Sequence, residues 1–136
     1  MINSNTEILN SRQILNSNIR NSSNYDLEMR TLAFAKSVRE FIKKIPRTMA
    51  NLEDGPQLVR SSGSVGANYI EANESLSRKD FILRVKISRK EAKESIYWLE
   101  LIETGGDSLL DSQKKSLIKE STELMKIFSA IVSKVS

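Results

Sequence analysis

Apolar residues recur at alternating spacings of four and three along four stretches of this chain. That spacing predicts amphipathic helices, each with one apolar face. The stretches are residues 26–45, 56–73, 78–102 and one that begins at Asp107 or Ser108 and runs toward the C-terminus. Connections of a few residues imply antiparallel neighbours. The pattern therefore predicts an all-α protein, an antiparallel up-down-up-down four-helix bundle over residues 25–136.

Start and stop signals set the bounds of these stretches. Pro46 stops the first helix, because proline cannot continue a helix interior. Residues 47–55 are expected as a loop, since Asp54-Gly55-Pro56 is a turn signal and proline suits the first turn of the helix that follows. Ser77 is the expected N-cap of the third helix, and Gly105-Gly106 is its expected stop.

Residues 1–24 are dominated by Asn and Ser, with scattered Ile and Leu. They offer too little apolar surface to offset the entropy of ordering, so we expect a disordered tail ahead of the bundle. The segment has neither the basic start nor the apolar core of a secretory signal.

The third stretch carries two apolar stripes rather than one. The first is a bundle seam: Phe81, Val85, Ser88, Ala92, Ser95, Leu99 and Ile102. The second, which we call the outer stripe, consists of Leu83, Ile87, Trp98 and Leu101, with Glu91 and Glu94 among them. A helix in a lone four-helix bundle needs one buried stripe. The outer stripe therefore predicts a second partner surface, which we take to be another subunit.

The second stretch contains a run of small residues from Ser61 to Ala67, including Gly63 and Gly66. Each glycine costs about 1 kcal/mol relative to alanine inside a helix. Close approach of another helix offsets this cost most simply. A phosphate-cradling loop is the alternative, but the run lacks the lysine and the spacing of a P-loop.

Composition limits the chemistry. The chain has no Cys and no His, which excludes disulfides, thiolate nucleophiles, imidazole bases and histidine-ligated metals. No apolar run approaches the length of about 18 residues that crosses a membrane. Hydrophobic content of 39% and charged content of 28% are typical of a soluble globular protein, and we expect it in the cytoplasm. We expect no enzyme activity, no catalytic residue and no cofactor.

The formal charge of +4 is mild, but basic residues gather between Arg78 and Lys93. Such a cluster either meets phosphate backbones or is an ordinary solvated helix face. Tyr97 follows the cluster on the same side, where an aromatic ring can stack a base. The candidate nucleic-acid contacts are Lys86, Arg89, Lys90, Lys93 and Tyr97. A smaller basic cluster comprises Lys36, Arg39, Lys43, Lys44 and Arg47.

Polar residues on the apolar faces are expected to act in packing. Glu91 and Glu94 lie three residues apart on one helical face, and buried carboxylates need hydrogen bonds or counter-charges. Their candidate partners are Arg60, Asn68 and Arg84. Di-metal bundles combine such glutamates with histidines, and this chain has none, so we expect no metal. The candidate interface or structural polar residues are Arg60, Asn68, Glu71, Glu91, Glu94 and Trp98.

Three stretches of the sequence resemble the bacterial 23S rRNA intervening-sequence protein family: YDLEMRTLAFAKSVREFIKKIPRT (25–48), QLVRSSGSVGANYIEANESLSRKDF (57–81) and RKEAKESIYWLELI (89–102). The resemblance covers about residues 25–132. It implies a left-handed antiparallel bundle that assembles into a ring-shaped homopentamer. Proteins of similar shape serve as accessory factors of diversity-generating retroelements, where they bind nucleic acid and a reverse transcriptase.

The family resemblance implies roles for the polar and basic residues singled out above. Arg60, Asn68, Glu71, Glu91 and Glu94 match recurrent family positions, and the resemblance implies that they hold the bundle and its subunit contacts together. The basic positions of the third helix would be the nucleic-acid face. We expect a non-enzymatic homo-oligomer that binds RNA or DNA. The alternative is a protein-binding scaffold or accessory subunit with no direct nucleic-acid role.

Overall fold

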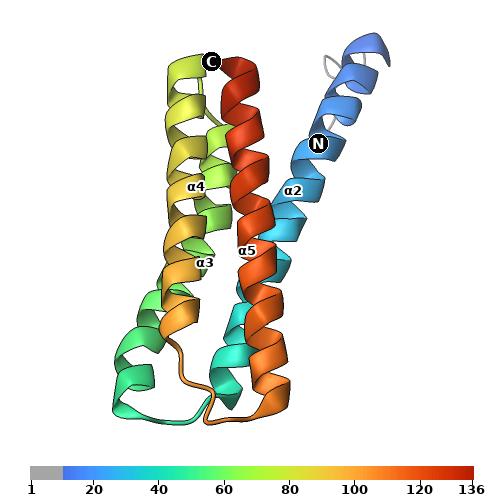
Figure 1. Cartoon of the computed structure of the whole chain (residues 1–136). Coiled ribbons are helices and arrows are strands. Elements are labelled where there is room, and N and C mark those ends of the chain that lie inside the picture. The colour runs from blue at the N-terminus through green and yellow to red at the C-terminus, as the bar shows by residue number, and fades with distance from the viewer. Residues whose placement is uncertain (1–10) are drawn as a thin grey trace.

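The structure is a computed structural model that describes residues 11–136, with side chains described from Asn24 onward. Over that range it is built from helices and contains no strand (Figure 1). The helices are α2 (Ser11–Lys44), α3 (Met49–Asn73), α4 (Arg78–Leu101) and α5 (Ser108–Val135). Successive helices run in opposite directions. Helix α3 packs on α4, α4 on α5, and α2 on both α3 and α5. The predicted all-α, antiparallel four-helix arrangement is confirmed.

The predicted seams form the core of the bundle. In α4, every seam residue after Phe81 is buried, and Phe81 packs against the core from its edge. The largest buried side chains from the other helices are Phe34, Phe41, Leu58, Tyr69, Leu124 and Phe128. Tyr69 and Phe128 meet as a tilted aromatic pair with ring centroids 5.8 Å apart. Burial of these faces is the main force that holds the helices together.

The small-residue run on α3 is a site of close helix contact, as predicted. A Cβ atom built on Gly66 would lie 2.6 Å from the Thr31 side-chain oxygen of α2, so only glycine allows this approach. On the other side of α3, the Ser61 and Ser95 hydroxyls are 2.9 Å apart. The Ser88 hydroxyl of α4 also donates to the backbone carbonyl of Val65 at 2.8 Å. Small side chains thus let α3 approach both α2 and α4.

Helix α3 begins earlier than the sequence predicts. The residues expected as a loop are helical from Met49, and Pro56 lies inside the helix. Thr48 is the N-cap, and its side chain accepts a hydrogen bond from the Asn51 backbone N–H at 3.1 Å. Buried Gly55 faces Ile42 of α2, so it serves packing rather than a turn. Capping and tertiary contact override the local turn signal.

Asn51 joins two chain connections at this end of the bundle. Its side-chain amide donates to the carbonyl of Pro46 at 2.9 Å and to that of Glu103 at 2.8 Å. Its side-chain oxygen accepts from the Glu103 N–H at 2.9 Å. These bonds tie the α2–α3 connection to the α4–α5 connection. The second connection turns at Gly105 and Gly106, whose φ angles of 68° and 80° favour glycine.

The predicted N-cap Ser77 is confirmed, and the fourth helix begins at Ser108, within the predicted start, with Asp107 as its N-cap. The Ser77 side chain accepts from the Asp80 N–H at the start of α4, and the Asp107 side chain accepts from the Leu110 N–H at the start of α5. Each satisfies a backbone donor that the first turn of a helix leaves free.

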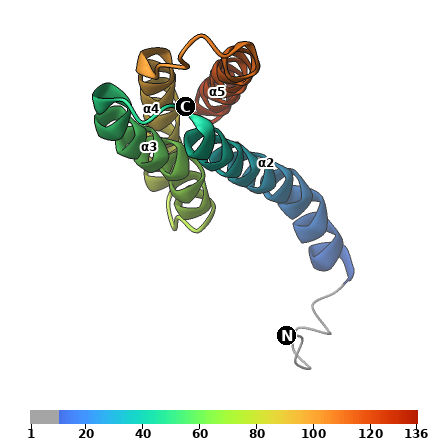
Figure 2. The ribbon, with the colours of Figure 1, turned by 90° about the horizontal axis from the view of Figure 1, so that it is seen from below.

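Helix α2 begins at Ser11, well before the predicted start at about Asp26. Its first turns extend away from the other three helices (Figures 1 and 2). The segment 11–23 contains neither Pro nor Gly, and each residue added to an existing helix gains a backbone hydrogen bond. The segment 11–24, expected as part of a disordered tail, is therefore helical here. Residues 1–10 lie outside the described part, so the prediction for them stays a prediction.

Across the described residues, no helix combines the length and the apolar character that a membrane crossing requires.

Candidate nucleic-acid interface

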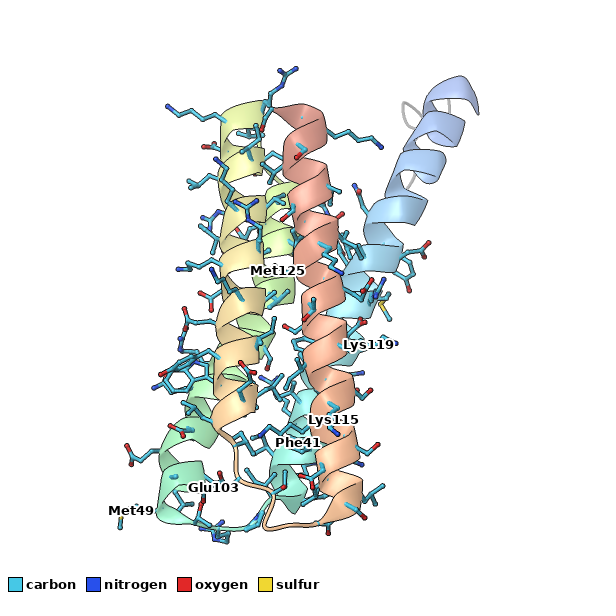
Figure 3. The ribbon with its side chains drawn as sticks, viewed as in Figure 1. Phe41, Met49, Glu103, Lys115, Lys119 and Met125 are labelled. Atoms are coloured by element: carbon cyan, nitrogen blue, oxygen red, sulfur yellow. The ribbon has the colours of Figure 1, made fainter. Side chains whose placement is uncertain are left out.

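The basic face predicted on the third helix lies on the solvent side of α4. Lys86, Lys90, Lys93 and Tyr97 occupy successive turns and are all exposed. The seam of α4 points the opposite way, into the bundle. Figure 3 shows several nitrogen-tipped side chains along this outer side of α4. We call these four residues the α4 basic face.

Arg89 does not belong to this face. It is half-buried at the edge between α4 and α5, and its guanidinium donates to the Ser129 hydroxyl at 3.5 Å. Residues three or four apart share a helix face, and Arg89 lies next to Val85 and Ala92, which are in the seam. It was predicted as a nucleic-acid contact because it stands in the basic run, but its angular position directs it toward α5.

Arg60 of α3 forms an ion-pair cluster with the two predicted glutamates of α4. Its guanidinium lies 3.0 Å from the Glu94 carboxylate and 3.8 Å from that of Glu91. Glu91 is only 6% exposed, and the ammonium of Lys90 lies 3.6 Å from its second oxygen. Lys90 is thus partly committed to neutralising a buried carboxylate. Nowhere between residues 24 and 136 do three or more acidic side chains come together as a metal site.

Asn68 and Arg84 pair with each other rather than with the glutamates. The Arg84 guanidinium donates to the Asn68 side-chain oxygen at 3.2 Å, and the Asn68 amide donates to the Ser64 carbonyl at 2.9 Å. This pair lies about two turns along the α3–α4 contact from the cluster formed by Arg60. Glu71 is exposed, and in the described part of the chain its side chain makes no hydrogen bond or ion pair. Asn68 and Glu71 share one face of α3, but their side chains make no hydrogen bond to each other.

The outer stripe of α4 divides in two. Leu83 and Leu101 are 55% and 42% exposed, while Ile87 and Trp98 are half-buried. Trp98 packs against the core from outside and meets the Tyr97 ring edge-on at 5.0 Å. Its indole N–H is buried without a hydrogen-bond partner in the described structure, as is one Glu91 carboxylate oxygen. An unsatisfied buried polar atom costs about 1–3 kcal/mol, which applies to the Trp98 N–H, whereas the Glu91 oxygen has the Arg60 guanidinium as a counter-charge at 3.8 Å.

One group of polar residues was missed by the sequence reasoning. Ser37 on α2 and Gln113 and Ser116 on α5 line a groove between these helices, together with Lys36 and Lys44. The two lysines were recognised as part of a basic cluster. The α5 residues carried no signal, because the packing of α5 against α2 is needed to bring them opposite those lysines.

The fold and the exposed face define a small antiparallel four-helix-bundle protein with a row of exposed lysines on α4. The chain belongs to the 23S rRNA-intervening sequence protein family, whose sequence pattern matches residues 23–130. The resemblance drawn from the three sequence stretches is thereby confirmed.

A solved structure supports the same assignment. The chain is similar to a protein from Bacteroides thetaiotaomicron, whose 1.70 Å crystal structure is described as a protein with unknown function from the S23 ribosomal protein family. The two share 32% sequence identity, with a TM-score of 0.70. The similarity covers 81% of this chain and 97% of the other. A search of curated proteins gives no match.

Proposed function

We propose that this protein is a non-enzymatic, homo-oligomeric helical bundle that binds RNA or DNA through the α4 basic face. The observation that carries the proposal is the placement of Lys86, Lys90 and Lys93 on successive exposed turns, ending at the exposed ring of Tyr97. Among the described residues, neither Lys86 nor Lys93 has an ion-pair partner, so both ammonium groups are available to phosphate. An exposed aromatic at the end of such a row can stack a base.

The energetics of this face are electrostatic. Binding of a nucleic acid to a row of lysines releases condensed counterions, so affinity falls steeply with salt. Each phosphate contact contributes a slope of about −0.9 for double-stranded DNA and about −0.7 for single strands, in log affinity against log salt. Lys90 contributes less than its neighbours, because its ammonium also neutralises Glu91.

Self-association is the second part of the proposal. The exposed Leu83 and Leu101 and the unsatisfied polar atoms of Glu91 and Trp98 all lie beside the α3–α4 contact. A second copy that covers this strip removes apolar area from water and supplies hydrogen-bond partners. A closed ring built from one repeated contact satisfies every copy equally. The family resemblance favours five subunits.

The test neutralises the two unpaired lysines. Lys86→Gln plus Lys93→Gln removes two charges without touching an ion pair in the described structure. A matched control, Lys126→Gln plus Lys134→Gln, removes two exposed charges from α5. Of these two lysines, only Lys126 has an ion-pair contact in the described structure, a weak one of 3.9 Å to Glu123. Fluorescence anisotropy with labelled single- and double-stranded RNA and DNA is measured across a salt series.

We expect the α4 variant to reduce the magnitude of the salt slope by about 1.8 with double-stranded DNA and about 1.4 with single strands, as two phosphate contacts are lost, while the control changes it little. An equal reduction of the salt slope in both variants would mean that the net charge of the protein, and not the α4 basic face, attracts the nucleic acid. No measurable binding by the unaltered protein at low salt would refute the nucleic-acid role.

A protein-binding scaffold is the second candidate, and the exposed Leu83 and Leu101 beside the basic face favour it. A protein partner buries apolar area there and leaves the lysines at its rim. In that case, replacing Leu83 and Leu101 by Ser abolishes the partner complex recovered from cells, while the double lysine neutralisation leaves it intact.

A further inference from the structure

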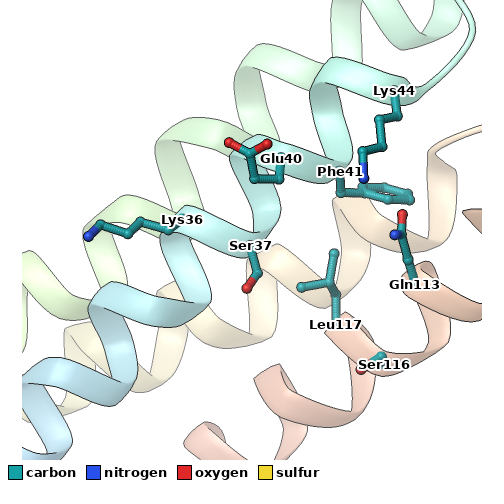
Figure 4. A pocket seen from close by; sticks show the side chains of 8 residues that line it. All are labelled: Lys36, Ser37, Glu40, Phe41, Lys44, Gln113, Ser116 and Leu117. Carbon is teal, nitrogen blue, oxygen red and sulfur yellow. The ribbon is translucent and has the colours of Figure 1, made fainter.

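A groove separates the C-terminal half of α2 from the start of α5 (Figure 4). Its volume is about 360 Å³, within the range of small-molecule sites. Buried Phe41 and Leu117 form an apolar floor between the two helices. The polar rim consists of Lys36, Ser37, Glu40, Lys44, Gln113 and Ser116.

Two cations stand at opposite ends of the groove. Lys36 and Lys44 are eight residues apart on α2, which is about 12 Å along the helix. Neither makes an ion pair in residues 24–136. The one carboxylate on the rim, Glu40, is already paired with Lys43 at 3.0 Å. The hydrogen bond from Lys43 lowers the pKa of Glu40, and the charge of nearby Lys44 lowers it further, so this carboxylate stays ionised. The rim carries two lysines against this one carboxylate, so its net charge is positive.

An unsatisfied acceptor lies at the Lys44 end of the groove (Figure 4). The side-chain oxygen of Gln113 is buried and has no hydrogen-bond partner in the described structure. Figure 4 shows its amide beside the Phe41 ring, next to the apolar floor. A ligand that offers an N–H at this point supplies the hydrogen bond that this oxygen lacks. The hydroxyls of Ser37 and Ser116 can donate or accept at the rim.

These three features describe complementary parts of one ligand: a flat apolar body, an N–H on its edge and a negative group on each side. We propose that the groove between α2 and α5 holds one unpaired nucleotide of a single strand, with its base over Phe41 and Leu117 and its flanking phosphates on Lys36 and Lys44. The base donates an N–H to Gln113. This inference rests on the proposed nucleic-acid function and adds a second contact surface, which selects unpaired bases.

An acidic peptide fits the groove less well. It supplies anions for the lysines and an N–H for Gln113, but its backbone brings further donors and acceptors that the apolar floor cannot satisfy. Proteins that recognise unpaired bases combine cations along the backbone with an apolar or aromatic pocket for the base. That combination matches this groove.

Thiol protection tests the inference, because the chain has no cysteine of its own. Ser116→Cys places one thiol on the rim of the groove, and Ser133→Cys places one on exposed α5 surface outside it. The rate of alkylation of each variant is measured alone, with a single-stranded 12-mer RNA or DNA, with the matching duplex, and with an acidic peptide of equal charge. Anisotropy on the same samples reports whether the strand is bound.

At a strand concentration about tenfold above the dissociation constant, we expect alkylation of Ser116→Cys to slow about tenfold, because only empty grooves react. Ser133→Cys should be unaffected, and the duplex should protect little. A bound strand that leaves Ser116→Cys reactive would overturn this inference while the proposed function stands. Absence of any bound strand would overturn both, and protection by the peptide alone would assign the groove to a protein partner instead.

Discussion

Replacement of Asn51 by alanine should loosen the end of the bundle where the two connections meet. The Asn51 side chain is 4% exposed and makes three hydrogen bonds of 2.8–2.9 Å, all to backbone groups of Pro46 and Glu103. Each such bond contributes about 1 kcal/mol net. Glu103 is exposed and Pro46 is half-buried, so water replaces part of what is lost. We expect Asn51→Ala to lower the free energy of unfolding by about 2–3 kcal/mol.

The assay is urea unfolding followed by helical circular dichroism, with Asn68→Ala as the matched control. Asn68 bonds to Ser64 of its own helix and to Arg84 of α4, but these two side-chain bonds are only partly buried, so we expect a loss of about 1 kcal/mol or less. A change below about 0.5 kcal/mol for Asn51→Ala, the range of ordinary surface substitutions, would refute the conclusion that this side chain holds the two connections together.

Four further substitutions test the packing and the pH dependence of stability. Leu99→Ala should lower the free energy of unfolding by about 2–5 kcal/mol, because it replaces a fully buried large side chain by a small one. Trp98→Ala should weaken assembly more than it lowers the helix content. If both variants instead unfold equally as monomers, the division of α4 into two faces is contradicted. Gly66→Ala should destabilise by about 1–3 kcal/mol because the new Cβ meets Thr31, and a raised melting temperature would contradict this. Burial raises the pKa of Tyr69, so the stability that its protonated form contributes is complete below pH of about 10 and is lost as pH rises through the folded-state pKa. Tyr69→Phe should remove this part of the loss of stability at alkaline pH. Identical dependence of stability on pH in the variant and the unaltered protein would refute the assignment to Tyr69.

The sequence predicted the seams because their periodicity follows directly from helix geometry. Val85, Leu99 and Leu124 are wholly buried, the cap at Ser77 forms as expected, and the fourth helix starts at Ser108 as expected. These features depend on residues that are close together in the sequence, so they can be predicted from the sequence alone.

The start of α3 could not be predicted in the same way. Asp54-Gly55-Pro56 is a strong local turn signal, and the contacts that override it come from α2 and from the distant Glu103. A helix that gains such tertiary contacts can include Pro56 and lose one backbone hydrogen bond.

The candidate site was predicted in part. Periodicity placed Lys86, Lys90 and Lys93 together, since they lie on one side of one helix. Periodicity alone could not show that Arg89 faces away from these lysines, because that depends on the position of α5. Nor could it show that Gln113 lies opposite Lys44, since the two residues are on different helices. Pairings between helices depend on their relative rotation and height, which a sequence does not display.

Light scattering coupled to size exclusion, run with and without nuclease, tests assembly and nucleic-acid binding in one experiment. We expect untreated material to carry nucleic acid that nuclease removes. We expect the remaining protein to have a mass near 77 kDa, five times the 15.4 kDa chain. A 15.4 kDa monomer free of nucleic acid before treatment would contradict both the assembly and the binding role.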